Sequence, residues 1–87
     1  MNDRGLRIMS EETIAKTLDA SGLACPMPVV KTRKAIGTLE IGEVLEVIST
    51  DPGSMPDMDA WARQTQHELL NSENRGTTFR FLLRKTH

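Results

Sequence analysis

Residues 43–50 read EVLEVIST and form the segment that decides the fold. Their near-continuous run of aliphatic and β-branched side chains is typical of a central strand covered by helices. Gly42 marks a turn before this run, and Asp51-Pro52-Gly53 breaks the chain after it. We therefore expect a strand over residues 43–50, with the neighbouring segments packed against it.

Upstream of this strand, CPMPVVKTRKAIG at residues 25–37 predicts a helix over residues 26–36. Proline is favoured in the first turn of a helix, and Gly37 is placed to end it as a C-terminal cap. The apolar side chains expected to face inward are Val29, Val30 and Ile36. The side chains expected to face water are basic: Lys31, Arg33 and Lys34.

The segment before this helix alternates between apolar and polar residues from Ile14 to Ala20. This alternation predicts a short strand that ends at the turn signal Ser21-Gly22. The first twelve residues are polar and aperiodic, so we expect a flexible tail over residues 1–12 and a single domain over residues 13–87. The natural start is then either Met1 or Met9.

Downstream of the central strand, Ser54 and Asp57 have the spacing of a capping box, which predicts the start of a second helix. One stripe of this helix is expected to be buried: Met58, Trp61, Ala62 and Thr65. Its end is ambiguous, because periodicity allows it to continue through Leu69, whereas residues 68–72 also form a plausible strand. We favour the strand, because Asn74-Arg75-Gly76 is a hairpin-type turn and TTFRFLLRK alternates after it.

The predicted order is β-α-β-α-β-β, an α/β (α+β) two-layer sandwich. The helical crossover makes the first two strands parallel and the terminal hairpin is antiparallel, so the four-stranded sheet is mixed, with two helices on one face. Trp61, Phe79 and Phe81 are expected in the core. The second face is left comparatively open and is either a docking surface or simply polar.

Length, charge and cysteine content argue against several classes of protein. A chain of 87 residues forms one domain, and a net charge of −1 with a pI near 6.1 gives no electrostatic footprint for nucleic acid or anionic lipid. Neither a signal peptide nor a membrane span is indicated, and a lone cysteine cannot form an internal disulfide. We therefore expect a cytoplasmic protein.

Cys25 is the one strong chemical candidate. His67 and His87 are widely separated from it in sequence, so neither a metal site nor a catalytic triad is indicated, and no cofactor is expected. At the opening of a helix, free backbone N–H groups and the helix dipole predict a lowered pKa for the thiol. Pro26 and Pro28 fix the backbone there, which places the sulfur on a preset corner.

A thiolate in this position can attack the terminal sulfur of a persulfide, carry that sulfur and offer it to another thiol. This transfer needs no base, metal or organic cofactor. The alternative for a lone cysteine is a buried, inert side chain.

The segment LDASGLACPMPVVKTRKAI at residues 18–36, followed by the β-rich run, the Asp51-Pro52 break, a helix and a hairpin, resembles the TusA/SirA family of small sulfur carrier proteins. The resemblance covers about residues 14–85. Its core is the Cys-Pro-x-Pro motif formed by Cys25, Pro26 and Pro28, approached through Gly22. It implies a fold like the C-terminal domain of translation initiation factor three, and a persulfide on Cys25.

The resemblance also implies partners. The sulfur donor would be a rhodanese or a cysteine desulfurase and the acceptor a DsrE-type protein, in tRNA thiolation, cofactor assembly or dissimilatory sulfur oxidation. The tRNA branch carries an acidic residue between the prolines, where this chain has Met27. Together with the run DPGSMPDMDAWARQTQHEL, this difference favours the sulfur-oxidation branch.

Docking candidates lie around the thiol or on the helix that follows it. They are Met27, Lys31, Arg33, Lys34, Asp51 and Met55. For Met58 a core position is favoured over a surface patch. A carrier that presents one thiol to two partners is expected to be a monomer, without direct contact to nucleic acid or membrane.

Two other function classes stay open. One is a non-catalytic interaction or regulatory module, in which the open sheet face binds a partner and the thiol is incidental. The other is a thiol redox protein, which is disfavoured because the chain has no resolving cysteine.

Overall fold

The structure is a computed structural model and describes residues 13–87. The six elements are β1 (Ile14–Ala20), α2 (Met27–Ile36), β2 (Val44–Ser49), α3 (Ser54–Thr65), β3 (Glu68–Asn74) and β4 (Phe79–Arg84). This order confirms the predicted β-α-β-α-β-β arrangement, including the strand after the second helix. The expected tail and the choice between Met1 and Met9 lie outside the described residues.

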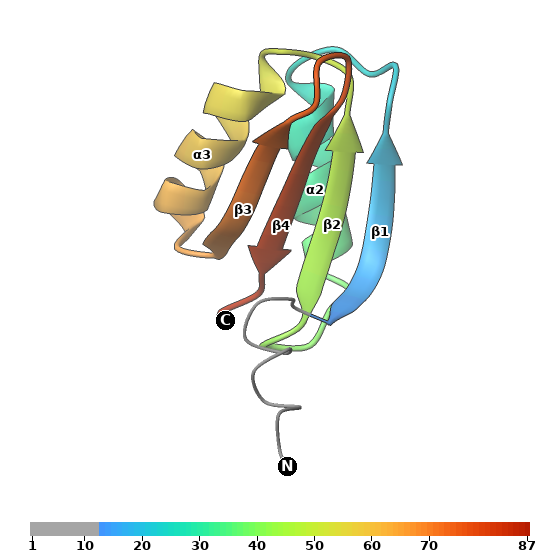
Figure 1. Cartoon of the computed structure of the whole chain (residues 1–87). Helices are drawn as coiled ribbons and strands as arrows, with labels where there is room; N and C mark the ends of the chain where they lie inside the picture. Colours follow the sequence, from blue (N-terminus) through green and yellow to red (C-terminus); the bar gives the residue numbers. More distant parts are fainter. Residues whose placement is uncertain (1–12) are drawn as a thin grey trace.

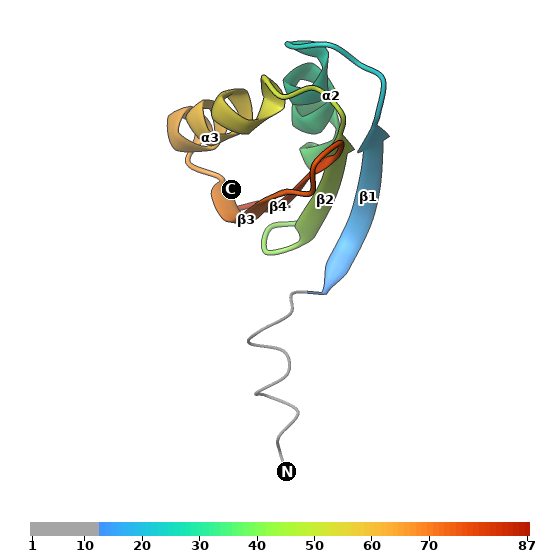
Figure 2. The same cartoon turned by 45° about the horizontal axis from the view of Figure 1, so that its top comes forward.

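The four strands form one mixed sheet in the order β1-β2-β4-β3 (Figure 1). β1 pairs parallel with β2, whereas β4 pairs antiparallel with both β2 and β3. EVLEVIST therefore forms an interior strand, as its apolar run predicts. Both helices cover the same face of the sheet (Figure 2), which confirms the two-layer architecture.

The core lies between this covered face and the two helices. Leu45 and Val47 of β2 stand opposite Leu83 and Phe81 of β4, and all four side chains are fully buried. From the helices, the core receives mainly Met58, Trp61 and Ala62 of α3 and Ala35 and Ile36 of α2. The predicted core positions of Met58, Trp61, Phe79 and Phe81 are confirmed.

The other face of the sheet carries ion pairs between neighbouring strands. Glu46 alternates with the buried positions of β2 and pairs with Arg80 of β4 at 2.5 Å. Thr17 of β1 donates a hydrogen bond to Glu46, and Arg84 of β4 pairs with Glu68 of β3 at 3.0 Å. The charges at the centre of this open face are thus satisfied within the sheet, as the polar interpretation predicts.

The inward orientation predicted for Val30 is wrong, since this side chain is 46% exposed. The buried residues of α2 are Pro28, Thr32, Ala35 and Ile36, spaced four, seven and eight positions from the first. Val30 lies off this stripe. Thr32 occupies a core position because its hydroxyl donates to the Pro28 carbonyl at 2.7 Å, which satisfies the buried polar group.

The predicted capping box is also wrong. Gly53 is the N-cap residue of α3, and no side chain caps the helix. The Ser54 hydroxyl instead donates to the Asp51 carbonyl at 2.6 Å. The Asp57 carboxylate is thereby left to interact outside its own helix. At the end of α2, Gly37 is the C-cap residue as predicted, with right-handed backbone angles.

Candidate functional site

Cys25 lies in the loop between β1 and α2, and its side chain is exposed. The loop leaves β1 through Gly22, whose φ of 82° is a left-handed conformation that glycine adopts without strain. The Gly22 N–H donates to the Thr50 hydroxyl at 2.8 Å, which ties the loop to the end of β2. Because the Cys25 side chain is exposed, the alternative of a buried, inert cysteine is excluded.

The two motif prolines lie at the start of α2. Pro26 is the N-cap residue, and Pro28 lies in the first turn, where its missing N–H leaves no helical bond unmade. The Cys25-Pro26 peptide bond is cis. Pro28 is fully buried, which anchors the helix start in the core, whereas Pro26 stays at the surface beside the thiol.

Two carboxylates from the segments that follow β2 meet Cys25, because the parallel strands β1 and β2 end at the same edge of the sheet. Asp51, in the loop after β2, accepts the Cys25 backbone N–H through Oδ2 at 3.0 Å. Asp57, in the first turn of α3, accepts a hydrogen bond from the Cys25 thiol. The sequence singled out Asp51 as a docking candidate and Asp57 only as a capping residue. In the structure both hold the cysteine.

These contacts raise the pKa of the Cys25 thiol above its ordinary value. The largest cause is the hydrogen bond to Asp57, followed by partial removal from water and by the negative charges of Asp57 and Asp51. The predicted lowering of this pKa is therefore wrong.

The N–H groups of the first turn of α2 explain the error. Those of Val29 and Val30 both bond to the Pro26 carbonyl at 3.1 Å, and Met27 bonds to the Ala24 carbonyl at 2.9 Å. Pro28 has no N–H to offer. The helix start therefore has no free donor for a thiolate, and the two carboxylates dominate the electrostatics of the sulfur.

Gly53 is a site residue that the sequence did not single out. A Cβ at this position would lie 3.1 Å from Asp51 Oδ2, 3.5 Å from Cys25 Cβ and 3.8 Å from Cys25 Sγ. Its φ of −64° suits any residue, so glycine is needed there for space rather than for its backbone freedom. The sequence did not reveal this close approach, because Asp51-Pro52-Gly53 was interpreted only as a break after the strand.

The other docking candidates differ in their exposure to solvent. Met27 is 39% exposed and directly follows the Cys25-Pro26 pair. Lys31, Arg33 and Lys34 are exposed on α2, up to seven residues beyond Met27, or about 10 Å along the helix axis. Met55 is half-buried against the core and Met58 is fully buried. A docking role for the accessible residues stays a prediction.

A hollow of about 280 Å³ lies beside the thiol, between the two helices. It is lined by Pro26, Val29, Asp57, Ala60, Trp61 and Gln64. Its walls are mostly apolar and Asp57 is its one charged residue. Asp57 therefore connects the thiol with this hollow.

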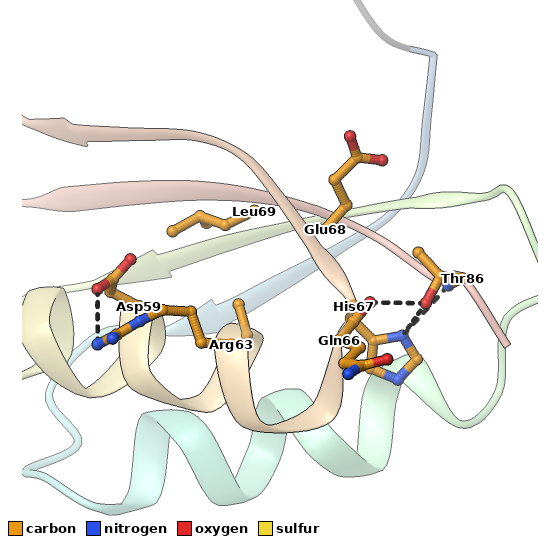
Figure 3. A pocket seen from close by; sticks show the side chains of 8 residues that line it. Asp59, Arg63, Gln66, His67, Glu68, Leu69 and Thr86 are labelled. Atoms are coloured by element: carbon orange, nitrogen blue, oxygen red, sulfur yellow. Dashed lines mark hydrogen bonds and ion pairs between the residues drawn. The ribbon is translucent and has the colours of Figure 1, made fainter.

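A second hollow, of about 500 Å³, lies at the C-terminal end of α3, away from Cys25 (Figure 3). Its lining includes Arg63, Gln66, His67 and Thr86. The Thr86 N–H donates to Nδ1 of the buried His67 ring at 3.2 Å, and burial is the main cause that lowers the pKa of this histidine. The His87 ring stacks on His67 at a centroid distance of 4.4 Å, so both histidines lie at the end of α3 opposite to Asp57.

Within residues 13–87, no cluster of three or more His, Cys, Asp or Glu side chains is arranged to hold a metal ion. Over the same residues, no helix has both the length and the apolar character that a membrane crossing requires.

Comparison with known proteins identifies the family. The family model described as Sulfurtransferase TusA matches residues 16–85, almost all of the described chain. The chain belongs to the TusA family. This membership confirms the resemblance inferred from the Cys-Pro-x-Pro segment.

Relatives within the TusA family are carriers by name. The chain is 56% identical over 68 residues to the putative sulfur carrier protein YrkF of Bacillus subtilis, a match that spans 78% of this chain and 37% of YrkF. It is 49% identical over 69 residues to the sulfur carrier protein TusA of Allochromatium vinosum, spanning 79% of this chain and 91% of that protein.

The crystal structure of a SirA-like protein from Desulfitobacterium hafniense has the same fold. The two structures align with a TM-score of 0.71, covering 83% of this chain and 99% of that protein, at 24% sequence identity. At this level of identity the likeness supports the α+β fold.

Proposed function

We propose that this TusA-family protein is a sulfur carrier in which Cys25 accepts a sulfane sulfur as a persulfide and passes it to an acceptor protein. The observation that carries the proposal is an exposed thiol on a corner fixed by Pro26, Pro28 and the Asp51 hydrogen bond. Family membership and the names of its relatives as sulfur carriers support it.

Each transfer is an exchange at sulfur without net oxidation or reduction. In loading, the Cys25 thiolate attacks the terminal sulfur of the donor persulfide, so that a new S–S bond forms and the donor S–S bond breaks. The donor leaves as a thiolate, and Cys25 becomes Cys-S-SH. In delivery, an acceptor thiolate attacks the terminal sulfur and Cys25 leaves as a thiolate, which regains a proton.

The proposed pathway is dissimilatory sulfur oxidation, with tRNA thiolation and cofactor biosynthesis as alternatives. In the proposed relay, a rhodanese or cysteine desulfurase loads the carrier and a DsrE-type protein receives the sulfur. Support for this branch comes from the exposed, apolar Met27 between the two prolines, where the tRNA branch carries an acid. The proposed carrier acts in the cytoplasm as a monomer, since a single accessible thiol serves both partners.

The proposal is tested by loading the purified protein from a persulfide donor and measuring its intact mass. We expect the wild-type chain to gain the mass of one sulfur atom, to lose it to an acceptor thiol, and to carry it on Cys25 in peptide maps. Cys25→Ser removes the only thiol with little change in size and serves as the matched control. Failure of the wild type to load from several persulfide donors would overturn the proposal, and full partner binding by Cys25→Ala would then favour an interaction module.

A further inference from the structure

The charged side chains that contact Cys25 are both negative. Asp51 and Asp57 contact the cysteine through its backbone N–H and its thiol, respectively. No hydrogen bond or ion pair within residues 13–87 joins Cys25 or either carboxylate to a basic side chain. By contrast, Asp59 on the same helix pairs with Arg63 at 3.1 Å.

We propose that Asp57 shifts the sulfur-free Cys25 further toward its neutral thiol form and thereby slows the reaction of the unloaded carrier with chance electrophiles and oxidants. This role belongs to a positioning residue, since Asp57 acts through the cysteine. The inference rests on the proposed carrier function for its purpose, but the contact itself does not depend on sulfur transfer.

The contact between Asp57 and Cys25 favours the protonated form of the thiol. A carboxylate can accept the hydrogen bond only while the thiol carries its proton, and deprotonation would place the sulfur anion directly against the Asp57 charge. The first-turn N–H groups that would otherwise stabilise the anion are bonded to the Pro26 and Ala24 carbonyls. The Cys25 N–H is bonded to Asp51. The two carboxylates therefore favour the thiol over the thiolate, and none of these N–H groups offsets them.

The interaction of Asp57 with Cys25 is weaker once sulfur is loaded. In Cys-S-SH the atom that bears the proton or the charge is the terminal sulfur, one S–S bond of about 2 Å beyond Sγ. Sγ then has no hydrogen to donate to Asp57. Asp57 therefore restrains the thiol of the unloaded carrier, while the terminal sulfur of the loaded carrier stays available to a partner.

The test is the rate of Cys25 alkylation by iodoacetamide, measured across pH on the full chain, which has no other cysteine. We expect Asp57→Asn to react faster than wild type at neutral pH and to reach its plateau at a lower pH. Each unit by which a thiol pKa falls raises the thiolate fraction about tenfold while the intrinsic nucleophilicity falls about threefold, so the rate rises about three- to fourfold per unit.

Asp59→Asn is the matched control, because it removes a carboxylate two residues further along α3 that faces Arg63 rather than the thiol. Its pH profile should superimpose on that of the wild type. Asp57→Ser provides a second variant if the asparagine variant unfolds, as judged by circular dichroism. A folded Asp57 variant with the wild-type profile, or with a plateau at higher pH, would overturn the inference.

The two proposals fail separately. Iodoacetamide carries no sulfur, so an unchanged alkylation profile removes the role of Asp57 and leaves the carrier function standing. If instead no variant accepts sulfur while Asp57→Asn is alkylated faster, the carrier function fails and the control of the thiol by Asp57 stands.

Discussion

Gly53 offers the sharpest test of how closely the cysteine loop is packed. In Gly53→Ala the new Cβ would lie 3.1 Å from Asp51 Oδ2, so the carboxylate must shift by a few tenths of an ångström. This shift strains the 3.0 Å hydrogen bond from the Cys25 N–H to Asp51. Gly37→Ala is a matched control, because Gly37 has nearly the same backbone angles and its nearest new contact would be 3.4 Å.

The expected difference follows from two opposing effects. Both alanines reduce the entropy of the unfolded chain, which stabilises the fold by about 0.4–1 kcal/mol where the backbone angles are compatible. Gly53→Ala also weakens the hydrogen bond from the Cys25 N–H to Asp51 and replaces glycine at the N-cap of α3 with the less favourable alanine, which together cost about 1 kcal/mol. We therefore expect Gly37→Ala to be stabilised and Gly53→Ala to be close to wild type. The gap of about 1 kcal/mol corresponds to roughly 4–8 °C in Tm.

Thermal unfolding followed by circular dichroism measures this gap, and iodoacetamide alkylation of Cys25 reports on the site in the same samples. Gly53→Ser keeps the added Cβ but supplies a residue favoured at a helix N-cap, so it separates crowding from capping. Equal stabilisation of Gly53→Ala and Gly37→Ala, with unchanged alkylation kinetics, would refute the argument that the site needs glycine for space.

Three further outcomes are expected, each checked by urea or thermal unfolding. Phe81→Ala should lower the free energy of unfolding by about 3–5 kcal/mol, because this side chain is fully buried at the centre of the core, while Phe81→Leu should cost clearly less. Burial, with the charges of His87 and Lys85, lowers the pKa of His67. Since the unfolded chain then binds a proton that the folded chain does not, wild-type stability should fall as pH drops below about 6.5, and His67→Asn should flatten this dependence. Hydrogen bonds from Arg80 and Thr17 lower the pKa of Glu46, so its contribution is present above the ordinary value of about 4.5 and is lost as pH falls through the lowered pKa. Glu46→Gln should lose stability at neutral pH and show a shallower decline in acid; an identical acid limb would contradict the role of this pair.

Local patterns in the sequence were sufficient for most of the fold. The apolar run of β2, the alternation in β4 and the buried stripe of α3 depend on periodicities that each segment carries by itself. The crossover and the hairpin then leave few arrangements for four strands and two helices. Errors occurred where a side chain's surroundings depend on another element, as for Val30, which lies just outside the stripe that meets the sheet.

The sequence by itself also determined that Cys25 is the only thiol and that prolines fix its corner, because these are properties of one short segment. The direction in which the pKa of that thiol is shifted was decided only by the tertiary structure. Asp51 and Asp57 lie 26 and 32 residues away along the chain. The parallel pairing of β1 with β2 brings Asp51 to the cysteine, and the packing of α3 beside α2 brings Asp57 to the sulfur. Charge interactions act through space rather than along the sequence, so a helix start that predicts a stabilised thiolate instead holds a thiol between two carboxylates.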